Sequence, residues 1–177
     1  VLAINTLGVL YICETGDSVK TIDDLSGKTI YASGKGATPE YALNYILDKA
    51  GILDEVNIEW KSEHSECVAA ITSDKDAIAM LPQPFVTTAM MADPDIHVAL
   101  DLNEEWEKLD GNALLTGVVI ANAEFVKDNE KVIDEFLDRY NTSVEYVNTD
   151  LEGAADLIEK YGIVKKAVAL KALPECN

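Results

Sequence analysis

Residues 29–51 read TIYASGKGATPEYALNYILDKAG: a short apolar segment, a turn with two glycines and an amphipathic segment, in that order. Residues 29–32 are typical of a short buried strand. Thr38 suits a helix N-cap, Pro39 the first helical position and Gly51 the end of the helix. Apolar residues recur between these signals at helical spacing, namely Ala42, Leu43, Ile46, Leu47 and Ala50. The stretch therefore predicts a strand, a glycine-containing loop and a helix.

The same alternation continues to residue 100, with strands predicted at residues 56–60, 77–81 and 96–100 and helices at 62–72 and 85–91. Such alternation is typical of an α/β fold with a parallel-dominated sheet and helices on both faces. Apolar segments at residues 2–12 and 114–121 flank this unit, and residues 122–173 are predicted to be helical. We therefore predict a hinged, two-lobed protein: residues 1–14 as a first-lobe hinge strand, 15–113 as the second lobe, and 114–177 as the return strand and helices of the first lobe.

The charge balance excludes several partners. The 177-residue chain has 14 Lys and Arg against 32 Asp and Glu, a formal net charge of -18. Nucleic-acid binding depends on a basic surface, and no basic stripe is present, so we expect no nucleic-acid partner. An anionic membrane surface is disfavoured for the same reason. No segment of about 18 apolar residues indicates a membrane-spanning helix, and no signal peptide is visible.

The loop Ser33, Gly34, Lys35, Gly36, Ala37 and Thr38 is the first candidate binding site. Two glycines allow a ligand to approach the backbone closely. The following helix start offers free N–H groups and the positive end of its dipole. These features suit a carboxylate, sulfonate, phosphate or polar heterocycle, and the alternative is a plain tight turn. The loop lacks the GxxxxGK[ST] and GxGxxG spacings of nucleotide-binding loops.

The segment Pro82, Gln83, Pro84 and Phe85 is the second candidate, since it also follows a predicted strand and precedes a helix. The prolines restrict the backbone and leave Gln83 as a fixed amide. We expect both loops to leave the same edge of the sheet and to converge on one ligand. Asn5, Thr6 and Tyr11 on the opening strand are further candidates that would face the ligand from the other lobe, although an ordinary strand explains them as well.

Catalytic and metal-binding patterns are weak. His64 lies among polar residues and is interpreted as a solvated surface histidine, and His97 begins a predicted strand. Cys13, Cys67 and Cys176 are widely spaced and are interpreted as buried apolar residues or isolated thiols. We therefore expect no catalytic residues, no metal and no cofactor.

Several segments together resemble a known family. They are NTLGVLYI (residues 5–12), DDLSGKTIYASGKGATPEYALNYIL (23–47), AMLPQPFVTTAM (79–90), EEW (104–106), TGVVIA (116–121) and the stretches FLDRYNTSVEYVN and YGIVKKAVALKALPECN. This pattern resembles the solute-binding proteins of ABC importers, in the branch with nitrate-, sulfonate-, taurine- and thiamine-precursor-binding members. The family usually has LPEPF where this chain has LPQPF, so Gln83 replaces an acid.

The resemblance implies a type II periplasmic-binding-protein fold whose lobes close on a small polar or anionic solute, with a membrane permease as partner. It implies an extracytoplasmic location, in the periplasm or on the outer membrane face, reached through a signal or lipoprotein segment, and a monomer when intact. It also implies truncation at both ends, with a complete second lobe and a partial first lobe that exposes apolar surface from residue 2 to 12. The alternatives on this fold are an enzyme similar to the thiamine-pyrimidine synthases and the effector-binding domain of a transcription regulator.

Overall fold

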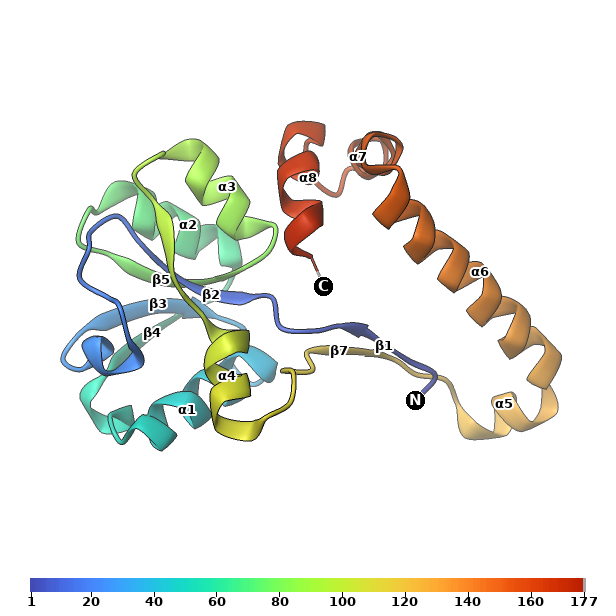
Figure 1. Cartoon of the computed structure of the whole chain (residues 1–177), viewed down its shortest axis with the longest axis horizontal. Coiled ribbons are helices and arrows are strands. Elements are labelled where there is room, and N and C mark those ends of the chain that lie inside the picture. Colours follow the sequence, from blue (N-terminus) through green and yellow to red (C-terminus); the bar gives the residue numbers. More distant parts are fainter. Residues whose placement is uncertain (177) are drawn as a thin grey trace. The chain divides into compact units, whose positions relative to one another are not determined.

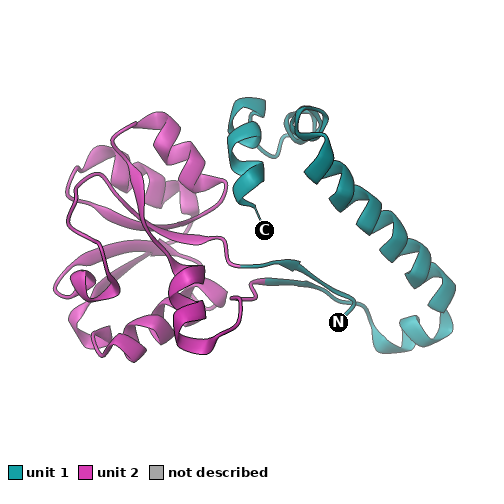
Figure 2. Cartoon of the chain, viewed as in Figure 1, with its two compact units in different colours: residues 1–7, 117–177 teal, residues 8–116 magenta. Residues whose placement is uncertain are grey.

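The computed structural model describes residues 1–176 and forms two compact units (Figure 2). Unit 2 comprises residues 8–116, and unit 1 comprises residues 1–7 with the described residues from 117 onward. The predicted boundary after Glu14 is wrong, because residues 8–14 belong to unit 2. The second boundary lies at Thr116 and not at residue 113. The chain thus passes between the units at Leu7–Gly8 and again at Thr116–Gly117.

Among the described residues, unit 2 contains a five-stranded sheet in the order β4-β3-β5-β2-β6 (Figure 1). Strand β3 (Thr29–Ser33) is parallel to both β4 (Asn57–Lys61) and β5 (Ile78–Pro82). Strand β2 (Leu10–Glu14) is antiparallel to β5 and to β6 (His97–Asp101), so β6 runs in the same direction as β3, β4 and β5. The predicted parallel-dominated α/β sheet is confirmed, and β2 is its one antiparallel member among the described residues.

Helices cover both faces of this sheet, as predicted. Helices α1 (Thr38–Ala50) and α4 (Leu102–Asp110) pack on one face, and α2 (His64–Ser73) and α3 (Phe85–Ala92) on the other (Figure 1). Strand β2 serves both cores, because successive side chains of a strand point to opposite faces. Its Leu10 and Ile12 join the core under α1, whereas its Tyr11 and Cys13 join the core under α2 and α3. Short 3-10 turns occupy Ile22–Leu25, Leu53–Glu55 and, in unit 1, Leu173–Glu175.

The predicted continuous strand over residues 2–12 is wrong. It is interrupted between β1 (Ala3–Thr6), in unit 1, and β2. Within the interruption, only glycine fits at position 8, because a Cβ added to Gly8 would lie 2.3 Å from Cβ of Asn103. The expected apolar exposure is confined to the first part of the segment, since Ile4 is 53% exposed whereas Ile12 is fully buried.

The predicted strand over residues 114–121 is also shorter, and only β7 (Gly117–Val119) forms. Leu114 is buried in the core of unit 2, and its amide donates to Oδ1 of Asn103 at 3.0 Å. The same Asn103 side chain packs against Gly8. One residue of α4 therefore holds both chain segments that connect unit 2 to the rest of the chain.

Unit 1 pairs β1 with β7 in antiparallel register and continues into the predicted helical region. Its helices are α5 (Ala123–Asp128), α6 (Glu130–Thr149), α7 (Leu151–Lys160) and α8 (Lys166–Ala172). Two paired strands alone are marginally stable, and Val118 on β7 and Ile120 just after it are 47% and 72% exposed. A cavity of about 260 Å³ nearby is lined by Val119, Phe125, Ile133 and Phe136 among others. Across residues 1–176, every helix is too short or too polar to cross a bilayer.

The cysteines provide a first prediction. Cys13 and Cys67 are buried, and Cys176 is exposed. Burial raises the pKa of Cys13 to about 12 and raises the pKa of Cys67 and of Cys176 as well, so accessibility is what separates Cys176 from the other two thiols. Because the thiolate is the reactive form, we expect iodoacetamide to modify Cys176 in the native chain and the other two only after denaturation. Mass spectrometry of the labelled peptides checks this, and rapid native labelling of Cys13 would contradict its place in the core.

Candidate functional site

The loops that follow β3, β4, β5 and β6 all emerge at the carboxyl edge of the unit 2 sheet. The parallel registers of β3 with β4 and with β5 place these strand ends side by side. The antiparallel strand β2 begins at this edge, where Leu10 pairs with Pro82. The prediction that the Gly34–Gly36 turn and Gln83 leave the same edge is confirmed. Ligands of open α/β sheets commonly bind at such an edge.

The first predicted loop is a compact glycine turn. Gly34 and Gly36 have φ angles of 85° and 82°, in the left-handed region that favours glycine. The amide of Ala37 donates to the carbonyl of Gly34 at 3.1 Å, and the amide of Gly36 donates to Oε2 of Glu40 at 2.6 Å. Helix α1 has Ala37 and not Thr38 as its N-cap. The loop therefore already binds one carboxylate oxygen, from its own helix.

The other predicted residues of this loop face different surroundings. Ser33 is 2% exposed and lies beneath the loop, whereas Lys35 and Ala37 are exposed. Thr38 lines a cavity of about 530 Å³ on the flank of unit 2, between α1 and the segment after α4. Two members of that cavity, Tyr45 and Trp106, have ring centroids 4.8 Å apart. The loop thus divides into a buried serine, an exposed turn and a threonine on the flank.

The second predicted loop is anchored on both sides. The amide of Gln83 donates to the carbonyl of Val9 at 3.1 Å. Its side-chain Oε1 accepts from the hydroxyl of Thr87 at 2.9 Å and from the Thr87 amide at 3.4 Å, so it caps α3. The peptide between Gln83 and Pro84 is cis. A glutamate could make the same cap, but only glutamine adds the N–H donors of Nε2.

The sequence pattern did not predict the role of His64, which begins α2 at the same edge. Its Nδ1 forms a hydrogen bond with Oγ of Ser33, and its ring centroid lies 5.0 Å from that of Phe85. Burial lowers the pKa of His64, with a smaller opposing effect from the carboxylate of Glu63. The interpretation of His64 as a solvated surface residue is wrong. One feature of the sequence could have indicated this position. His64 follows the predicted strand at residues 56–60, just as the glycine turn and the proline loop each follow a predicted strand.

The Ser33 hydroxyl has a second neighbour on α2. It lies within hydrogen-bonding reach of the Cys67 thiol, which is fully buried. Residues from β3, α2 and α3 therefore meet in one cluster, defined here as the edge cluster: Ser33, His64, Cys67 and Phe85. This cluster joins the two predicted loops beneath the sheet edge, since Ser33 precedes the glycine turn and Phe85 follows the proline loop.

The candidates on the opening segment do not belong to this cluster. Asn5 and Thr6 lie on β1 in unit 1, where a Cβ added to Gly117 would meet Oδ1 of Asn5 at 2.7 Å. Tyr11 is 7% exposed and packs in the core of unit 2. The expectation that Tyr11 faces a ligand from the other lobe is therefore wrong, because β2 is an inner strand of the unit 2 sheet.

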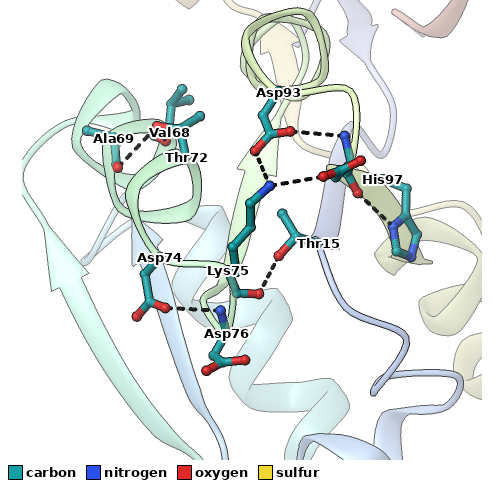
Figure 3. Close-up of polar contacts among 10 residues, drawn as sticks. Thr15, Val68, Ala69, Thr72, Asp74, Lys75, Asp76, Asp93 and His97 are labelled. Carbon is teal, nitrogen blue, oxygen red and sulfur yellow. Dashed lines mark hydrogen bonds and ion pairs between the residues drawn. The ribbon is translucent and has the colours of Figure 1, made fainter.

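The opposite edge of the sheet carries a network of charged side chains that bind one another (Figure 3). The ammonium of Lys75 contacts Asp93 at 2.7 Å and Asp95 at 3.1 Å. Thr15 donates its hydroxyl to the carbonyl of Lys75, and His97 lies beside the Asp95 carbonyl. The hydrogen bonds from Lys75 to Asp93 and Asp95 raise the pKa of Lys75, and the bond from Lys75 is the main cause that lowers the pKa of Asp93. In the part of the chain that the structure describes, no group of three or more His, Cys, Asp or Glu is placed to hold a metal.

Comparison with known proteins assigns the family. The model of the NMT1/THI5-like family matches residues 1–154. The chain belongs to the NMT1/THI5-like family. A search of curated protein sequences gives no match.

Solved structures have the same fold as this NMT1/THI5-like chain. They include the periplasmic aliphatic sulphonate binding protein SsuA of Escherichia coli, at 16% identity and a TM-score of 0.77, covering 99% of this chain and 58% of that one. An ABC transporter protein of Parabacteroides distasonis is 21% identical, with a TM-score of 0.71, and the match covers 98% of this chain and 58% of that one. The alkanesulfonate-binding protein SsuA of Xanthomonas axonopodis pv. citri, bound to MOPS, is 17% identical, with a TM-score of 0.65. The match covers 98% of this chain and 60% of that one. The chain thus spans less than two thirds of each relative's length.

Proposed function

We propose that this chain is the main part of the extracytoplasmic solute-binding component of an ABC importer. The main observation behind this proposal is that the glycine turn, His64 and the proline loop meet at the carboxyl edge of one sheet. The family match and the descriptions of the structural relatives support a binding role without catalysis. The partners would be a small solute and a membrane permease, and the intact protein would be monomeric. No observation favours the enzyme or the regulator over this function.

The chemistry of the edge favours a solute rich in hydrogen-bond acceptors. Donors at or near it are the Nε2 group of Gln83, the ring of His64 and the exposed ammonium of Lys35. The Gly36 amide donates to the carboxylate of Glu40, so a solute oxyanion at this turn would replace that carboxylate oxygen. Asp101 lies at the end of β6 on this edge, but its carboxylate is bound by the Asn103 amide at 2.8 Å as a helix cap. We therefore propose an anionic or polar solute such as a sulfonate or a carboxylate.

Thermal unfolding in the presence of candidate solutes tests this function. A panel of sulfonates, nitrate, bicarbonate, amino acids and pyrimidines should contain a compound that raises the melting temperature. A solute at about 100 times its Kd adds about 2.7 kcal/mol to the free energy of unfolding.

Two variants locate that effect. Gln83→Ala should reduce the shift, measured from the variant's own unliganded melting temperature, whereas Asp95→Asn at the opposite edge should not. A panel without any stabilising solute, or an equal shift in all three proteins, would count against the proposed site.

A further inference from the structure

His64 is fixed in place from two other elements. Ser33, at the end of β3, binds its Nδ1, and the ring of Phe85, at the start of α3, lies against it at a tilt of 44°. Because Nδ1 is occupied by Ser33, the second ring nitrogen, Nε2, is the one left for an incoming group. The imidazole is thus held at the sheet edge with one nitrogen committed to the protein.

The hydrogen bond between Ser33 and His64 can survive a change of protonation. In the neutral tautomer with the ring proton on Nε2, the Ser33 hydroxyl donates to Nδ1. When the imidazole is protonated, Nδ1–H donates to Oγ of Ser33, and the hydroxyl can turn toward the sulfur of Cys67. The ring therefore keeps its position, and its Nε2–H remains a donor in both states.

We propose that His64 is a proton-linked solute contact, whose Nε2–H donates to an oxygen of an oxyanion bound at the carboxyl edge. This proposal rests on the function proposed above and adds the coupling: oxyanion binding and protonation of His64 favour each other. The ligand class is a sulfonate or carboxylate, whose negative charge stabilises the imidazolium.

The surrounding charges set the sign of the effect. On α2 and its cap, the carboxylates of Glu63 and Glu66 lie near the edge cluster, and Lys61 at the end of β4 lies near Cys67. Ser33 on β3 and Phe85 on α3 bring no charge. Burial outweighs Glu63, so the pKa of His64 lies below its ordinary value. A bound oxyanion raises this pKa, and the affinity for the oxyanion therefore rises as the pH falls.

The size of the effect follows from the pKa change. An opposite charge at close range shifts a pKa by about one unit or more, and one unit corresponds to a tenfold change in affinity. We expect the affinity for methanesulfonate to increase about tenfold between about pH 8 and about pH 5. Methanesulfonate is a suitable probe because it stays fully ionised over this range, so its own titration makes no contribution.

NMR titration of the full chain tests the proposal through its two histidines. Long-range ¹H–¹⁵N spectra report the tautomer and the pKa of each ring. We expect His64 to have its proton on Nε2 and to show a higher pKa in saturating methanesulfonate. His97, at the opposite edge, provides an internal control whose ring resonances should not respond to methanesulfonate.

Matched variants separate this inference from the proposed function. His64→Gln should bind methanesulfonate with little pH dependence, whereas His97→Gln should keep the wild-type dependence. If methanesulfonate binds with the same pH dependence in His64→Gln, or leaves the pKa of His64 unchanged, the inference is wrong and the proposed function stands. If methanesulfonate does not bind at any pH, the oxyanion contact is overturned, and the solute panel decides the function independently.

Discussion

Replacing Ile12 with alanine is expected to lower the free energy of unfolding of unit 2 by about 2–5 kcal/mol. Ile12 is fully buried at the middle of β2, between β5 and β6, and packs in the core under α1. Removal of its side chain leaves a cavity between two layers that are otherwise closely packed. Urea denaturation followed by circular dichroism measures the change.

Val98→Ala is the matched control for Ile12→Ala, because Val98 lies on β6 of the same sheet but is 37% exposed. It should cost less than about 1 kcal/mol, as surface substitutions generally do. The comparison also tests the assignment of β2 to unit 2. If Ile12→Ala is as mild as Val98→Ala, β2 does not form part of the core that the structure shows.

Replacing Gly34 with alanine should have the largest effect on solute binding. Gly34 has a φ of 85°, and an added Cβ would lie 2.9 Å from Cγ of Pro39. The left-handed conformation alone costs a non-glycine residue about 1–2 kcal/mol, and relief of the contact requires the turn to move. If movement of the turn makes the free energy of solute binding about 1.4 kcal/mol less favourable, the affinity for the solute falls about tenfold. Calorimetric titration with the solute found in the thermal screen measures this loss.

Gly36→Ala isolates the contact from the backbone strain. Gly36 has nearly the same φ, 82°, but a Cβ there would meet nothing within 4 Å. The free energy of unfolding of the Gly36→Ala variant should fall by about 1–2 kcal/mol, because alanine must adopt the left-handed conformation there but meets no clash. We therefore expect Gly34→Ala to bind more weakly than Gly36→Ala. Equal affinities in the two variants would show that the approach of Pro39 to Gly34 does not shape the site.

Local signals in the sequence were sufficient for most of unit 2. The strand, turn and helix over residues 29–51 and the alternation up to residue 100 follow from short-range patterns of apolar residues, Pro and Gly. The shared edge of the two loops followed from the parallel sheet. The assignment of β2 to unit 2 could not be predicted, because an apolar strand has the same composition whether it lies in one lobe or in the other. Only long-range pairing with β5 and β6 assigns it.

The candidate site shows the same limit. The turn geometry at Gly34 and Gly36 follows from residue type, whereas the burial of Ser33 and Tyr11 depends on which elements pack against them. His64 is surrounded by polar residues in the sequence but by Ser33 and Phe85 in space. Such contacts join residues far apart in the chain, and no local pattern encodes them. Gln83 was predicted as a fixed amide, and its fixation comes from Thr87 one turn into α3.

A crystal structure with 2-bromoethanesulfonate is the most direct test of where the solute binds, because the anomalous signal of bromine locates the ligand without prior assumptions. We predict that the sulfonate lies against the Gly34–Gly36 turn within reach of His64 and Gln83. Bromine density beside Lys75, Asp93 and His97 at the opposite edge, with the glycine turn unoccupied, would contradict this.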